Sequence, residues 1–140
     1  RGGVYGRQHG EKRRVTPLRL TLPLPPNRNR GSRSSGWAWY AAKKKWNEEA
    51  DRWAALPSFP APPAQPFARV TVSAVLVMPS PMDDDNALYR ASKAPLDWLK
   101  TRGYIVDDSR KHVRWASLPE QRITRSEPGR VEITIQEVAA

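Results

Sequence analysis

One apolar run near the middle of the chain constrains the fold more than any other feature. Residues 67–78 alternate with the period of a strand, and Val75 and Val77 make its second face apolar as well. A strand that is apolar on both faces is usually central in its sheet. The proline-rich residues 57–66 precede it and Pro79 follows it, and proline lacks the N–H that a strand ladder needs. The sequence therefore predicts a central strand bounded by proline-rich connections.

The rest of the chain supplies strands and helices around that run. Strand periodicity appears over 18–24, 113–115 and 131–136, helical periodicity over 37–56 and 86–102, and a hairpin or longer loop is expected over 118–130. Asp85 or Asn86 is expected to cap the second helix, Pro95 to kink it and Gly103 to end it. The predicted fold class is α/β, with a mixed sheet of about four strands and two main helices in one domain over 18–140. The tryptophans of the first helix are expected in the core.

Positive charge is concentrated at the start of the chain. The net charge is +10, and residues 1–33 hold nine basic residues against one acid. Residues 1–17 are expected to form a disordered basic arm. The polar loop 27–36 is either a linker or a contact for phosphate oxygens. Such a balance indicates a polyanionic partner, and nucleic acid is favoured over a membrane because no basic amphipathic helix is present.

Two further features of the composition limit the function classes. The chain has no cysteine, which excludes disulfides and thiolate zinc sites. It shows no apolar run of the roughly 20 residues that span a membrane, and no signal peptide. A cytoplasmic protein is expected.

Acidic residues form two small groups in this basic chain. Asp83, Asp84 and Asp85 follow the central strand, and Asp107 and Asp108 follow the second helix. Carboxylate oxygens suit Mg²⁺ or Mn²⁺, and carboxylates held close together normally imply a bound cation. Asp is equally at home in helix caps and turns, where it accepts hydrogen bonds from free N–H groups. The pattern alone leaves open a metal site and a purely structural use.

An ordered set of motifs resembles the RusA family of Holliday junction resolvases over residues 18–138. The set comprises Leu20-Thr21-Leu22-Pro23-Leu24-Pro25-Pro26, Asn29-Arg30, Asp83-x-Asp85-Asn86, Lys93, Asp97, Leu99, Gly103 and Asp107-Asp108. The resemblance implies a small Mg²⁺-dependent endonuclease of bacteria or phages that acts as a homodimer on four-way DNA junctions. Mn²⁺ is the expected substitute, and a bacterial or phage-infected cytoplasm is the implied location.

The resemblance also implies roles for individual residues. Asp83, Asp85 and Asp108 match the catalytic, metal-binding carboxylates, with Asp107 as a neighbour. The family's helix lysine lies three positions after the Asn, where this chain has Tyr89. Lys93, one turn further along, is the expected catalytic cation, and Arg90 competes with it and is otherwise expected to bind DNA. The expected DNA-binding loop contains Arg28, Asn29, Arg30 and Arg33.

The sequence therefore predicts a structure-selective endonuclease that resolves branched DNA by paired phosphodiester cleavage. Two alternatives stay open. One is a basic nucleic-acid-binding protein without catalysis, whose acids only cap a helix. The other is a metal-dependent nuclease acting on other branched or single-stranded DNA.

Overall fold

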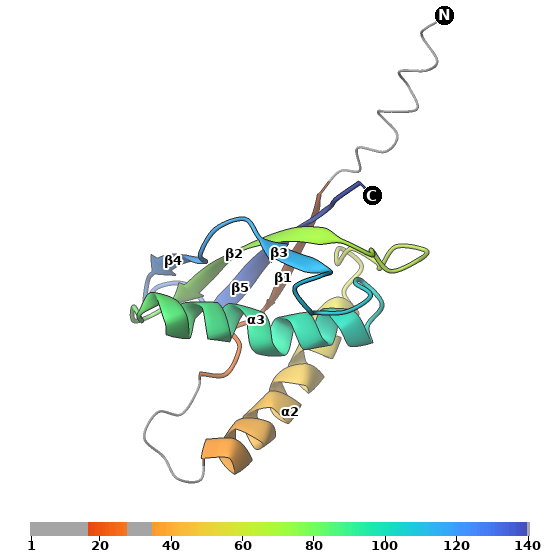
Figure 1. Cartoon of the computed structure of the whole chain (residues 1–140). Coiled ribbons are helices and arrows are strands. Elements are labelled where there is room, and N and C mark those ends of the chain that lie inside the picture. The colour runs from red at the N-terminus through yellow and green to blue at the C-terminus, as the bar shows by residue number, and fades with distance from the viewer. Residues whose placement is uncertain (1–16, 28–34, 140) are drawn as a thin grey trace, which may run out of the picture.

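The chain folds into a single α/β domain in which two helices cover one face of a five-stranded mixed sheet (Figure 1). The computed structural model describes residues 17–27 and 35–139. The elements are β1 (Leu18–Pro23), α2 (Ser35–Ala54), β2 (Val70–Met78), α3 (Asp84–Thr101), β3 (Val113–Trp115), β4 (Glu120–Ile123) and β5 (Arg130–Glu137). The expected basic arm, except for its last residue, lies outside the described residues.

The predicted central strand is confirmed as the centre of the sheet. The strand order is β1-β5-β2-β3, and β4 pairs with β2 on the same side as β3. β5 runs antiparallel to both β1 and β2, whereas β3 and β4 run parallel to β2. β3 pairs with the first residues of β2, from Val70, and β4 with its last residues, to Met78. Two short strands thus share one edge of β2.

Two local expectations were wrong. β4 lies within residues 118–130, where a hairpin or loop was expected, because its side chains are mostly exposed and give no apolar alternation. α3 begins at Asp84 with Asp83 as its N-cap, earlier than a cap at Asp85 or Asn86 would allow.

The helix continues through Pro95 as one element. Gly103 follows it with φ of 86°, the left-handed conformation typical of a residue just past a helix end.

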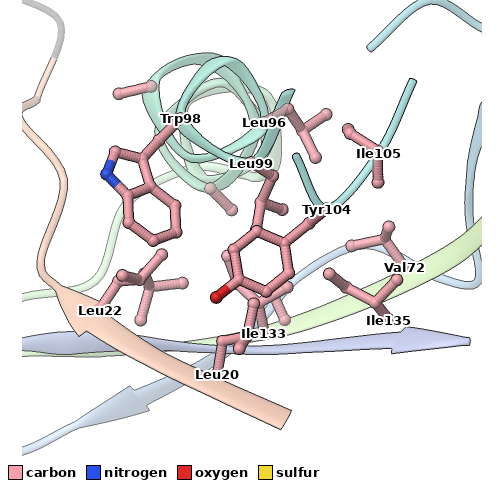
Figure 2. Packing of buried hydrophobic residues seen from close by; sticks show 14 of the residues in the cluster. Leu20, Leu22, Val72, Leu96, Trp98, Leu99, Tyr104, Ile105, Ile133 and Ile135 are labelled. Carbon is pink, nitrogen blue, oxygen red and sulfur yellow. The ribbon is translucent and has the colours of Figure 1, made fainter. Parts of the chain in front are cut away.

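The core lies between the sheet and the two helices. β1, β2 and β5 point alternate side chains toward the helices, and α3 returns Trp98 and Leu99 to meet them (Figure 2). Tyr104 and Ile105, just after α3, close one end of this layer. Each large apolar side chain buried in this way stabilises the fold by about 1.5–3 kcal/mol.

The opposite face of the sheet is polar. Thr71, Ser73 and Thr134 lie there only partly buried, and Glu132 accepts a hydrogen bond from Arg130 at 2.8 Å. One dry face and one wet face is the usual arrangement of a sheet with antiparallel pairs. Within residues 17–27 and 35–139, no helix combines the length and apolarity needed to cross a membrane.

The tryptophans of α2 divide between core and surface. Trp46 is buried, and its indole Nε1 donates to the backbone oxygen of Pro23 at 2.8 Å, which ties α2 to the end of β1. Trp39 and Trp53 are partly buried, whereas Trp37 is exposed. The expectation of core tryptophans therefore holds fully for Trp46 and is wrong for Trp37.

We expect Trp46→Phe to lower the free energy of unfolding by about 1–3 kcal/mol, because it leaves the Pro23 carbonyl without its donor and leaves a small void. Urea denaturation followed by circular dichroism measures the change. Trp37→Phe is the matched control and should shift the midpoint very little. Equal stability of the Trp46 variant and the native protein would contradict the assignment of this hydrogen bond.

Candidate functional site

A hollow of about 410 Å³ lies where β2 ends and α3 begins. It brings together segments that are far apart in the sequence, from the exit of β1 to the first turns of α3. Its lining residues are Leu24, Asn27, Met78, Pro79, Ser80, Pro81, Met82, Asp83, Asn86 and Arg90. Three of the motifs found in the sequence therefore contribute to one surface: the end of the Leu-Pro segment, the acidic group and the polar side of the helix.

Asp83 holds the N-terminus of α3. Its Oδ1 accepts a hydrogen bond from the backbone N–H of Asn86 at 2.9 Å, and its Oδ2 accepts one from Asn86 Nδ2 at 3.2 Å. Asp84 and Asp85 occupy the exposed first turn, where the positive end of the helix dipole favours carboxylates. The structural use of Asp83 as a cap is thus established. Each of its oxygens keeps a second lone pair for another partner.

The loop that carries Asp83 is fixed by a residue that the sequence did not single out. Gln121 of β4 accepts a hydrogen bond from Met82 N at 3.0 Å and donates one to Met82 O at 2.9 Å. Thr124 N also donates to Met78 O at 3.0 Å. The short strand β4 therefore positions the acidic loop. No local pattern pointed to Gln121, because its partner is a backbone group far away in the sequence.

Arg90 is the basic residue of this hollow. Its Nε donates to Pro25 O at 2.7 Å, and its Nη1 lies 3.6 Å from Met78 Sδ. Burial lowers the pKa of Arg90 below its ordinary value. Among residues 17–27 and 35–139, no carboxylate forms an ion pair with it. A partly desolvated guanidinium without a counter-ion is a favourable place for an anion.

Lys93 lies elsewhere. It is exposed on α3 and does not line the hollow. About 15 Å of helix separates it from Asp83, more than a lysine side chain spans. One turn beyond it, Asp97 forms an ion pair with Lys43 of α2 at 2.8 Å. The geometry therefore favours Arg90 over Lys93 as the cation beside Asp83.

Asp107 and Asp108 lie at the other end of α3. The helix of 18 residues between the two acidic groups is about 27 Å long. Asp107 lies 3.5 Å from Lys100, and its pKa is lowered first by a hydrogen bond from the backbone of Asp108 and further by Ser109 and Lys100. Within one chain, Asp108 is not brought together with Asp83 and Asp85.

The acids fit a magnesium ion in part. No group of three or more His, Cys, Asp or Glu side chains that could hold a metal occurs in the part of the chain that the structure describes. Mg²⁺ is commonly held by only one or two carboxylates together with waters and substrate phosphates. Asp83, with its free lone pairs, meets that smaller requirement, whereas Asp85 is exposed on the first turn of α3 and does not line the hollow.

The expected DNA-binding residues Arg28, Asn29, Arg30 and Arg33 lie outside the described residues. Asn27, the last described residue before them, lines the hollow beside Asp83. The described part of the chain before this segment therefore ends at the candidate site.

Comparison with known proteins does not assign this chain to a family. A scan against protein-family models gives no match, and a search of curated proteins gives none.

The two uses of Asp83 predict different outcomes for two substitutions. Asp83→Ala removes the cap and should lower the free energy of unfolding by about 0.5–2 kcal/mol. Asp83→Asn should cost much less, since Asn caps a helix about as well as Asp. Thermal melting followed at 222 nm would measure both, with the exposed Asp85→Ala as the control. If Asp83→Ala melts with the native protein, the cap contributes nothing to stability.

Proposed function

We propose that this protein is a Mg²⁺-dependent endonuclease that cleaves branched DNA, with four-way junctions as its substrate. One observation carries the proposal: Asp83 and Arg90, whose guanidinium forms no ion pair with any described residue, line the same hollow, although their motifs lie apart in the sequence. A carboxylate and an unpaired guanidinium around one space suit a phosphate and a cation that bind together. The net charge of +10 supports a polyanionic substrate.

Each residue would have a defined role in this proposal. Asp83 and Asp85 would hold the ion, which supplies charge neutralisation and an activated water when bound. Arg90 would bind a non-bridging phosphate oxygen with the donors that Pro25 does not use. The first turn of α3 adds the positive end of the helix dipole. Arg28, Arg30 and Arg33 would hold flanking DNA. A cytoplasmic location in a bacterial or phage-infected cell belongs to the same proposal.

Asp108 would join this site only from a second copy of the chain. In one chain the two acidic groups lie at opposite ends of α3 (Figure 1). A two-fold dimer that sets the start of α3 in one copy against residues 107–108 of the other would bring three carboxylates to each of two sites. Two symmetric sites suit paired cleavage of a junction. The proposed function therefore includes a homodimer with shared sites.

A second candidate is a DNA-binding protein without catalysis. The observation that favours it is that Asn86 donates a hydrogen bond to each Asp83 oxygen, and that Asp107 is likewise paired with Lys100. In that case the acids are caps and turn residues only. The two candidates differ in whether cleavage exists and depends on Mg²⁺.

We expect the protein to cut a four-way junction in Mg²⁺ or Mn²⁺, and neither in EDTA nor on linear duplex. Asp83→Asn, Asp85→Asn and Asp108→Asn should each lower the cleavage rate by about 100-fold or more, because a charged ligand is lost. Junction binding should stay equal or tighten, since less negative charge faces the phosphates. Denaturing gels measure cleavage, and mobility shifts in EDTA measure binding. If all three variants cleave at the wild-type rate, these acidic residues do not form the cleavage site.

Mixing variants tests whether the sites are shared. In a heterodimer of Asp83→Asn with Asp108→Asn, shared sites give one intact site and one doubly substituted site. The mixture should therefore regain nicking that neither variant has alone. Mixing Asp83→Asn with Asp85→Asn is the matched control and should regain nothing, because each shared site then holds one substitution. No recovery in the first mixture, with heterodimers demonstrated by tag capture, would place Asp108 outside the site.

The choice between the two cations of α3 gives a separate prediction. Arg90→Ala should lower cleavage by about 100-fold with a smaller effect on junction binding, because a charge beside the scissile phosphate acts mainly in the transition state. Lys93→Ala should change the rate by no more than about threefold, a peripheral charge effect. Single-turnover rates measure both. The reverse order would assign the catalytic cation to Lys93. A melting curve for Arg90→Ala separates catalysis from loss of its contact with Pro25.

A further inference from the structure

The N-terminal half of α2 presents an aromatic and basic surface. Trp37 is 73% exposed and Tyr40 is 66% exposed, the two most exposed large hydrophobic side chains among the described residues. They are three positions apart and Lys44 follows four positions later, so the three share one face of the helix. We call Trp37, Tyr40 and Lys44 the α2 platform. Large aromatic rings turned to solvent in this way are a poor use of apolar surface unless a ligand covers them.

The helix that carries the platform is held in place by contacts with the core and with α3. Its opposite face places Trp46 in the core and Trp39 against Tyr89 of α3, with ring centroids 6.3 Å apart. The Lys43–Asp97 ion pair joins the same two helices. The orange end of α2 projects away from the sheet in Figure 1. The platform rings are therefore carried by a helix that is already ordered. This reduces the conformational entropy that the protein loses when a flat ligand binds.

The charge around the platform indicates what kind of ligand it takes. Residues 35–47 contain three lysines and no acid, Glu48 and Glu49 follow them, and Arg28, Arg30 and Arg33 precede them in the sequence. Lys43 is paired with Asp97, but no ion pair among the described residues involves Lys44 or Lys45. A second copy bound through a two-fold axis at this face would set lysines against lysines, which is unfavourable. A polyanion with flat, apolar groups suits both the charge and the rings. Single-stranded nucleic acid has that chemistry, because its bases are free to stack and its phosphates are negative.

We propose that the α2 platform binds unpaired nucleotides, with bases stacked on Trp37 and Tyr40 and phosphates near Lys44. A continuous duplex offers no such bases, since its own stacking buries their faces. The platform would therefore favour single-stranded segments over continuous duplex. This binding needs neither the ion nor the acidic site, so it stands apart from the proposed cleavage.

The test measures binding without metal, so failure of the proposed cleavage does not affect it. Fluorescence anisotropy in EDTA compares an oligothymidylate of about 20 nucleotides, longer than one binding site, with a duplex of the same length. Trp37→Leu keeps an apolar side chain and loses the ring, and should weaken oligothymidylate binding about tenfold, as for one lost base stack. Trp37→Phe keeps a ring and should stay within about threefold of the native protein. Duplex binding should change little in either variant.

Three controls decide the interpretation. An abasic oligomer of the same length should bind the native protein and Trp37→Leu alike, because it has no bases to stack. Lys44→Ala should lower the slope of log affinity against log salt by about 0.7, the value for one phosphate on a single strand, while Trp37→Leu should leave that slope unchanged. Leu56→Ala, an exposed apolar residue just beyond the other end of α2, should have no effect.

Specific results would overturn the proposal. Equal losses in Trp37→Leu and Trp37→Phe, or equal losses on oligomer and duplex, would rule out stacking on this ring. Equal native affinity for the abasic and normal oligomers would do the same. If sedimentation shows that Trp37→Leu converts a native dimer into a monomer, the platform is a contact between copies of the chain.

Discussion

The fold depends on the pairing of β2 along both of its edges. One edge pairs with β5 over eight residues, and the other is shared by β3 and β4. On this shared edge, β3 pairs with the first residues of β2 and β4 pairs with its last residues. β4 fixes the acidic loop through Gln121, while the segment after α3 is fixed beside Phe67, which bridges to Ile105. β2 and the residues just before it therefore help to position both acidic groups.

The sequence predicted those parts of the fold that depend on local, periodic burial. The central strand, the last strand and both helices were predicted because buried positions repeat with the period of each element. Gly103 indicated the end of α3 because glycine readily adopts the left-handed conformation found just past a helix. β4 was not predicted, since its pairing with β2 is long-range and its side chains are exposed. The start of α3 was misplaced because three consecutive Asp residues and an Asn can all serve as caps, and local preference does not rank them.

The candidate site was predictable as residue types but not as geometry. Asp83 and Arg90 were both singled out, yet only the folded chain places them around one hollow with Asn27. The choice of Lys93 rested on motif spacing, which does not determine which side chains line a cavity. The sequence does not show that the chain stays at the far end of α3 after the helix, which keeps Asp108 away from Asp83 within one chain (Figure 1). Homodimer, metal and substrate remain proposals that these positions support.

The two edge strands of the sheet lack the long, flat and unprotected form that promotes edge-to-edge aggregation. β1 carries Arg19 and Thr21 turned to solvent and ends at Pro23, which offers no N–H to a further strand. The opposite edge is broken into β3 and β4, and Glu120 and Arg122 of β4 are exposed. Neither edge presents a long, flat ladder to another sheet. Edge-to-edge pairing between two copies of this chain is therefore disfavoured, and a contact through side-chain surfaces is favoured instead.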